Sequence, residues 1–186
     1  MLFRSAEDYD TAIPILQEAA DNGDAEAQNK LGTCYIYGWG VDQDYDEAFE
    51  YLQLAADQGN SDAIYQIGYM YEYGQGLEQD YDKAMEYYQM AADQGHGTAL
   101  NNIGDMYEHG YGVEQDYEKA LEYYNAAIEA GDAFGYWSMG TLYEEGLGVE
   151  QDYEKAEEYY RIAADMGVQE AAEALERLME KELVEE

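Results

Sequence analysis

The feature that most restricts the fold of this chain is a period of 36 residues. Glycine recurs at positions 23, 59, 95, 131 and 167, and tyrosine recurs at positions 9, 45, 81, 117 and 153. A fixed period of this length is typical of a solenoid, in which each unit buries its apolar face by stacking on its neighbours. The sequence therefore predicts an array of similar modules.

The first half of each period has the pattern of an amphipathic helix. Ala48, Leu52 and Ala55 are spaced by four and three residues, which places them on one helical face. Asp44 stands before this segment and suits an N-cap, and Gly59 after it suits the left-handed residue that ends a helix. We expect one helix here in every repeat.

The second half of each period predicts another helix, with a glycine inside its apolar face. Ala63, Ile67 and Met70 form the face, and Gly68 lies within it. Glycine in a helix interior costs about 1 kcal/mol relative to alanine. Its recurrence in all four copies predicts that a neighbouring helix approaches closely at that point. The recurrent tyrosines of the other helix, at positions 51, 87, 123 and 159, are predicted to serve packing.

These residues resemble the Sel1-like repeat, a relative of the tetratricopeptide repeat. The first copy of the pattern consists of Ala27, Leu31, Gly32, Tyr35, Gly38, Gly40, Val41, Asp44, Ala48, Ala55, Ala56 and Gly59. The pattern returns at 63–95 and 99–131, and a fourth copy has Gly135 in place of the leading alanine. The resemblance covers nearly the whole chain. It implies an all-α, right-handed superhelical solenoid of antiparallel helix pairs.

The resemblance also implies a domain organisation, with a single solenoid domain over residues 1–186. Repeats are expected at 24–59, 60–95, 96–131 and 132–167, between a capping helix at 6–23 and another at 168–186. The last segment loses the repeat glycines and gains charged residues. A terminal module whose outer face meets solvent needs such a polar surface.

The chain is strongly acidic, and this restricts its partners. Its 43 acidic and 8 basic residues give a net charge of −35. Nucleic acid and anionic membranes would be repelled, whereas a basic protein or peptide would be attracted. Solubility of the surface, or a high-salt habitat, would account for the same charge. Because no long apolar stretch or signal-peptide core is evident, we expect a cytoplasmic protein. We also expect a monomer.

Candidate ligand contacts come from the resemblance, because the first helix of each tetratricopeptide repeat lines a concave groove. Positions there that differ between repeats are not explained by packing. Tyr65, Tyr69 and Tyr73 are four residues apart and are predicted to form a ladder, unless they only pack between repeats. Asparagine amides would clamp a peptide backbone, and acidic and aromatic side chains would hold a cation. The candidate concave-face residues are Asn29, Tyr37, Tyr65, Tyr69, Glu72, Tyr73, Asn101, Asn102, Asp105, Glu108, His109, Trp137 and Glu144.

No residue pattern indicates catalysis, a cofactor or a metal. His96 and His109 lack the spacing of zinc ligands, and Gly110-Tyr111-Gly112 lacks the lysine and hydroxyl residue of a phosphate loop. Cys34 is the single cysteine, so no internal disulfide forms, and it has no histidine near it in sequence. We therefore expect a non-enzymatic chain with no catalytic residues, no cofactor and no metal site.

The function that follows is a protein- or peptide-binding adaptor or scaffold that uses the concave face for a basic partner. Three alternatives remain open. The chain could be an immunity or antitoxin protein that masks a basic toxin. It could be an engineered or structural repeat array without a natural ligand, as near-identical stretches at 114–120 and 150–156 suggest. The third alternative is the hydrolysis or binding of cell-wall compounds, a role linked to some secreted relatives.

Overall fold

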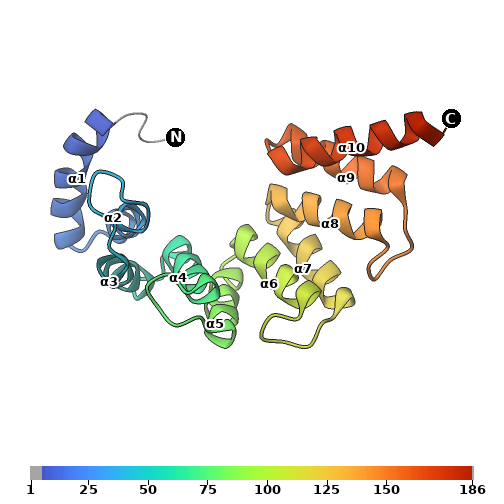
Figure 1. Cartoon of the computed structure of the whole chain (residues 1–186). Helices are drawn as coiled ribbons and strands as arrows, with labels where there is room; N and C mark the ends of the chain where they lie inside the picture. The colour runs from blue at the N-terminus through green and yellow to red at the C-terminus, as the bar shows by residue number, and fades with distance from the viewer. Residues whose placement is uncertain (1–5, 186) are drawn as a thin grey trace. The chain divides into compact units, whose positions relative to one another are not determined.

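Residues 6–185 of the computed structural model are described, with side chains for residue 9 and residues 11–178, and they form ten α-helices and no strand (Figure 1). Helix α1 (Ala6–Asp21) comes first and α10 (Gln169–Glu185) last. Between them lie four helix pairs, which we call the first to fourth repeats. They are α2 (Ala25–Tyr37) with α3 (Tyr45–Ala56), α4 (Ser61–Tyr73) with α5 (Tyr81–Ala92), α6 (Gly97–His109) with α7 (Tyr117–Glu129), and α8 (Ala133–Glu145) with α9 (Tyr153–Asp165).

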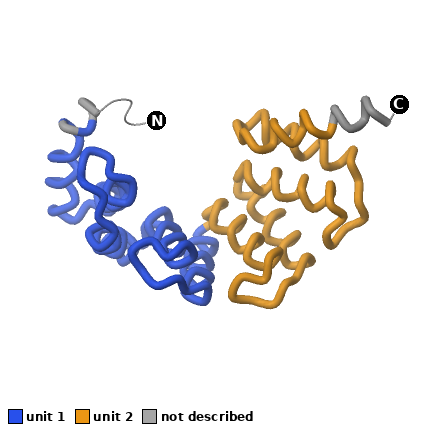
Figure 2. Tube along the Cα trace, viewed as in Figure 1, with its two compact units in different colours: residues 1–94 blue, residues 95–186 orange. Residues whose placement is uncertain are grey.

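The chain divides into two compact units (Figure 2). Unit 1 covers residues 1–94 and contains α1 to α5, and unit 2 covers residues 95–186 and contains α6 to α10. Within each unit every helix packs on the next one in the chain. Among the described helices, none combines the length and the apolar character that crossing a membrane requires.

Side-chain caps start the helices where the sequence predicts them. Asp80 Oδ1 accepts the backbone N–H of Lys83 at 3.0 Å at the start of α5, and the other second helices begin at the equivalent aspartate. His96 caps α6, because its Nδ1 accepts the N–H of Ala99 at 3.1 Å. These bonds satisfy N–H groups that have no partner inside the helix.

Two glycines shape the loop between the helices of a repeat. Gly74 ends α4 with a φ of 65°, and its N–H donates to the Met70 carbonyl. Gly76 also has a positive φ, and a Cβ added there would lie 2.2 Å from Tyr45 Cβ, at the start of α3. The loop of one repeat thus rests on the first residue of the preceding second helix. Gly40 meets Tyr9 and Gly148 meets Tyr117 in the same way, which explains why these tyrosines recur with the second glycine of the loop.

The helical glycines mark the closest helix crossing in each repeat, as predicted. A Cβ on Gly68 would lie 2.8 Å from the Tyr88 ring, and a Cβ on Gly104 would lie 2.4 Å from the Tyr124 ring. Both rings are fully buried. Glycine is therefore needed so that a large side chain of the second helix can reach the backbone of the first.

The remaining core contacts agree with the packing predictions. Tyr51 stacks on Tyr35 with ring centroids 5.8 Å apart, and the equivalent tyrosines of the other repeats stack at 5.6 to 5.7 Å. Cys34 is 3% exposed, and burial raises the pKa of its thiol. This cysteine is a core residue, since a raised pKa disfavours the reactive thiolate.

Candidate interaction surface

Polar side chains join the first helices of neighbouring repeats. Gln66 Nε2 of α4 donates to Asn29 Oδ1 of α2 at 2.8 Å, and Ser138 Oγ of α8 donates to Asn101 Oδ1 of α6 at 3.0 Å. Asn29 and Asn101 are 6% and 5% exposed. The expectation that these asparagines lie open in a groove is corrected, because adjacent first helices pack closely enough to bury both amides.

The glutamates that were expected to meet a partner's cations are also held by the protein itself. Tyr88 donates its hydroxyl to Glu72 Oε2 at 2.5 Å, and Tyr160 donates to Glu144 Oε2 at 2.8 Å. Glu72 is 7% exposed, so its predicted exposure is wrong. Glu144 also accepts from Arg177 of α10 at 2.7 Å. The cation that meets Glu144 therefore comes from the chain's own last helix.

The first repeat has an apolar version of this tyrosine–glutamate pair. Leu52 and Ile36 stand at the two positions, and they are 0% and 4% exposed. Both members of the pair change together. Changing one alone would leave a buried hydroxyl or a buried carboxylate without its partner, at a cost in free energy. This joint change was visible in the aligned repeats, and it was the signal by which the pairs could have been found.

The tyrosine ladder predicted on α4 is present in unit 1. The ring centroids of Tyr65 and Tyr69 lie 6.3 Å apart, and those of Tyr69 and Tyr73 lie 4.4 Å apart. Tyr65 and Tyr69 are partly buried, and Tyr65 stacks on Tyr88, whereas Tyr73 is 56% exposed. Burial is the main cause that raises the pKa of Tyr69, and the neighbouring Tyr37 raises it further. The ladder is thus a packed support with an exposed end.

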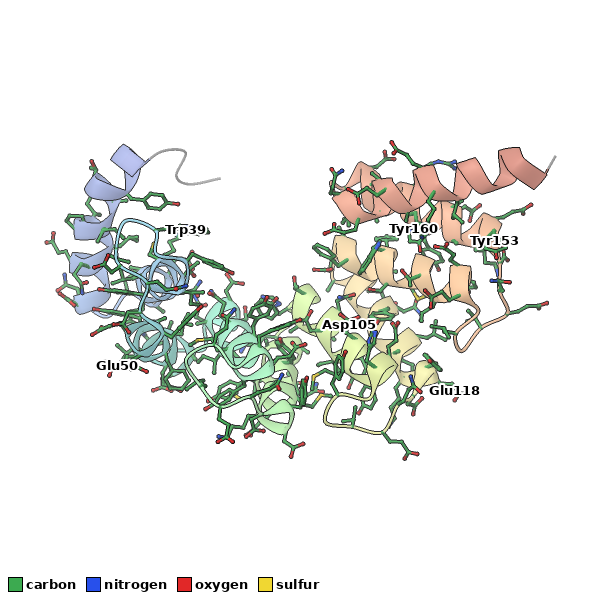
Figure 3. All side chains as sticks on the ribbon, in the orientation of Figure 1. Trp39, Glu50, Asp105, Glu118, Tyr153 and Tyr160 are labelled. Carbon is green, nitrogen blue, oxygen red and sulfur yellow. The ribbon has the colours of Figure 1, made fainter. Side chains whose placement is uncertain are left out.

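A second aromatic pair lies at the end of α2. Tyr37 and Trp39 stack with centroids 4.7 Å apart, and both are exposed (Figure 3 labels Trp39). Trp39 was not among the predicted residues. It lies between the two loop glycines, where the other repeats have Gln75, Tyr111 and Leu147. That variability was the available signal. We call Tyr37, Trp39, Tyr69 and Tyr73 the aromatic surface of unit 1.

In unit 2 the predicted residues form a mixed surface. Trp137 is partly buried, with its ring edge-on to Phe134. His109 is exposed and stacks on Tyr111 with centroids 5.3 Å apart. Asn102 is partly exposed. The predicted residues of this unit therefore do not form a continuous aromatic ladder.

The third repeat contains a buried group of acids around one tyrosine (Figure 3 labels Asp105). Tyr124 Oη lies 2.7 Å from Asp105 Oδ1 and 2.5 Å from Glu108 Oε2. A phenol has one proton to donate, so both short contacts are satisfied when one carboxyl is itself protonated. Burial is the main cause that raises the pKa of Asp105 and of Glu108, and the hydrogen bond from Tyr124 opposes it.

These acids and His109 are also the described residues whose ligand atoms could converge on a metal ion. One ligand atom each from Asp105, Glu108 and His109 lies within 4.8 Å of the others. His109 Nδ1 faces the Asp105 backbone oxygen at 3.0 Å, and Nε2 faces Glu108 Oε1 at 3.9 Å. The expectation that zinc has no site rested on the spacing of His96 and His109, whereas this group combines one histidine with two carboxylates.

We expect the stability of the protein to rise as the pH falls from neutrality toward the unfolded-state pKa of a carboxyl, about 4, because folding raises the pKa of Asp105 and of Glu108. A carboxyl whose pKa is raised by folding binds a proton more tightly when folded, so its contribution is lost as the pH rises through the folded-state pKa. Asp105→Asn keeps an oxygen for Tyr124 and removes the buried charge. At about pH 7 its melting temperature should exceed the wild type by roughly 2 to 4 °C. Thermal unfolding followed by circular dichroism measures this shift.

The difference in melting temperature between Asp105→Asn and wild type should narrow as the pH falls, because the raised pKa of folded Asp105 lets it take up a proton at a higher pH than the unfolded chain does. Asp42→Asn removes the same charge from an exposed side chain and is the control. An equal shift in both variants would show that net charge, rather than the burial of Asp105, sets the pH dependence.

The ten described helices, arranged as stacked pairs, place the protein in the class of α-helical solenoids. The sequence profile of the Sel1 repeat matches residues 25–60, 61–96, 97–132 and 133–168. The chain belongs to the Sel1 repeat family. A comparison with curated proteins gave no match.

Solved structures agree with this assignment. A Sel1 repeat protein from Oxalobacter formigenes is 35% identical with a TM-score of 0.78 over 89% of this chain. A protective antigen present in uropathogenic Escherichia coli strains is 37% identical with a TM-score of 0.75 over 85%. An immunity protein from Pseudomonas aeruginosa is 28% identical with a TM-score of 0.67 over 88%. This chain spans 66%, 34% and 61% of the length of these proteins, respectively.

Proposed function

We propose that this chain is a non-enzymatic scaffold that binds a basic peptide or protein segment on the first helices of its repeats. The observation that carries the proposal is the aromatic surface of unit 1. Tyr37 is 54%, Trp39 43% and Tyr73 56% exposed. Tyrosine and tryptophan are enriched among residues that dominate binding energy, because they bury much area with little loss of rotamer freedom.

The charge of the chain supports a basic partner. With 43 acids against 8 bases, long-range attraction would speed encounter with a cationic segment. Exposed aromatic rings also attract ammonium and guanidinium groups through their π electrons. The aromatic surface would therefore supply affinity, and the surrounding acids would supply selection for basic sequences.

The test is a peptide array that varies net charge and aromatic content, probed with the full chain at low and high salt. We expect retention of basic peptides, and weaker retention at high salt. Tyr37→Ala/Tyr73→Ala should weaken binding about 30-fold or more, because even one hot-spot truncation costs about 2 kcal/mol. Both side chains are exposed, so the variant should still fold.

Tyr153→Ala is the matched control, because Tyr153 of unit 2 is 47% exposed (Figure 3). It should leave peptide retention unchanged. Equal retention of acidic and basic peptides, or equal loss in both variants, would contradict the proposal.

A second candidate is an immunity protein that masks a basic toxin. The likeness to immunity proteins from Pseudomonas aeruginosa, at 28% and 27% identity, favours it. Co-expression distinguishes the two functions. An immunity protein must restore the growth of cells that produce one particular toxin, whereas a general peptide scaffold leaves that toxicity unchanged.

A further inference from the structure

Three of the four repeats place a lysine over a stacked pair of tyrosines. In the second repeat Lys83 Nζ lies 4.8 Å from the centre of the Tyr71 ring, which stacks on Tyr87. The same ammonium lies 3.6 Å from Asp80 Oδ2, the cap of α5. The third and fourth repeats repeat this geometry, with Nζ-to-ring distances of 4.7 and 4.9 Å. An ammonium over a tyrosine ring and beside a carboxylate is favoured by both groups.

Two of these lysines, Lys83 and Lys119, line surface recesses. The recess of the second repeat, about 330 Å³ in volume, is lined by Tyr71, Tyr87 and Lys83, and by Gln53 and Asp57 of the preceding repeat. Gln53 Nε2 donates to Asp57 Oδ1 at 2.8 Å. The wall opposite the lysine is therefore held in place by a hydrogen bond.

The first repeat has the equivalent tyrosine, glutamine and aspartate residues but no lysine, and its Gln17 Nε2 also donates to Tyr51 Oη at 2.7 Å. Tyr35 and Tyr51 stack with centroids 5.8 Å apart. Gln17 and Asp21 of α1 stand where Gln53 and Asp57 stand, and Gln17 Nε2 likewise donates to Asp21 Oδ1 at 2.8 Å. Glu47 occupies the position of Lys83. We call Gln17, Asp21, Tyr35, Glu47 and Tyr51 the Tyr35 recess.

The charged residues of this recess that the structure describes, Asp21 and Glu47, are both negative. Asp44, Glu47 and Glu50 of the first repeat are exposed, as is Asp21 (Figure 3 labels Glu50). Burial is the main cause that raises the pKa of Tyr35, and Tyr51, Glu47 and Asp44 raise it further. The ring surface that holds a lysine in the other repeats therefore has the carboxylates of Glu47 and Asp44 acting on it here.

We propose that the Tyr35 recess binds a lysine side chain supplied by a partner protein. The aromatic pair supplies the π face, the carboxylates neutralise the ammonium, and the other three repeats show that this arrangement accommodates a lysine. Since the recess is separate from Tyr37 and Tyr73, the proposal stands independently of the proposed function.

The probe is N-acetyl-lysine methylamide, added to the full chain with assigned tyrosine ring signals in NMR spectra. Its uncharged analogue, N-acetyl-norleucine methylamide, has a similar shape and no ammonium. We expect the lysine probe alone to shift the ring signals of Tyr35 and Tyr51 in a saturable manner. Uniform small shifts across all tyrosines, or equal shifts with norleucine, would overturn the proposal.

Two variants exchange the residues that the first and second repeats have at the position of the lysine. Glu47→Lys should fill the recess with the chain's own lysine, and probe affinity at Tyr35 should fall about tenfold, as expected when a cation–π contact and a carboxylate are both lost. Lys83→Glu should produce new, saturable shifts at Tyr71 and Tyr87. Glu154→Lys makes the same charge change at an exposed site in unit 2 and should leave the Tyr35 shifts intact. Unchanged probe binding in Glu47→Lys, or no new shifts in Lys83→Glu, would refute the site.

Discussion

Gly104→Ala should lower the free energy of unfolding by about 3 kcal/mol, although alanine is the better helix former by about 1 kcal/mol. The added Cβ would lie 2.4 Å from Cε1 and 2.6 Å from Cδ1 of Tyr124, whose ring is fully buried and held by its hydroxyl contacts. Neither the ring nor the helix backbone has room to move without disturbing the crossing of α6 and α7. Urea unfolding followed by far-ultraviolet circular dichroism measures the loss.

Gly131→Ala is the control for this substitution. Gly131 has a φ of 84°, and a Cβ there would meet nothing within 4 Å. It should cost about 1 to 2 kcal/mol through backbone strain alone. If Gly104→Ala proved neutral or stabilising, the close crossing would not be what requires glycine inside these helices.

Tyr88→Phe should destabilise the protein by about 2 kcal/mol, which is the usual value of a hydrogen bond to a charged group. The substitution removes only the hydroxyl that donates to Glu72 Oε2 at 2.5 Å, and it leaves the buried ring in place. The carboxylate, 7% exposed, loses this donor while remaining out of water. Urea unfolding again gives the free energy.

The single variant is best compared with the double variant Tyr88→Phe/Glu72→Ile. This variant makes both positions apolar, as Leu52 and Ile36 are in the first repeat. Replacing both partners of a buried hydrogen bond by apolar groups is nearly neutral, so the double variant should recover most of the loss. A double-mutant cycle should give a coupling energy of about 1 kcal/mol or more. Strict additivity of the two single substitutions would mean that the pair does not act as a unit.

The predicted ladder shows how far the sequence could place the candidate site. The spacing of Tyr65, Tyr69 and Tyr73 correctly predicted rings in contact along α4. The same reasoning placed Asn29 and Asn101 on an open face, and the structure buries both. Spacing assigns a residue to a helical face. It does not show whether that face meets solvent or the next repeat.

The residues alone predict the 36-residue period, the helix pairs, their aspartate caps and the glycines at loops and crossings. These features depend on backbone geometry and on packing that every repeat shares, so repetition exposes them. Which of the varying side chains stay at the surface depends instead on how the helices pack. Gln66 reaches Asn29, Tyr88 reaches Glu72 and Arg177 reaches Glu144 across distances that no local pattern encodes, because each contact is formed only when separate helices pack together.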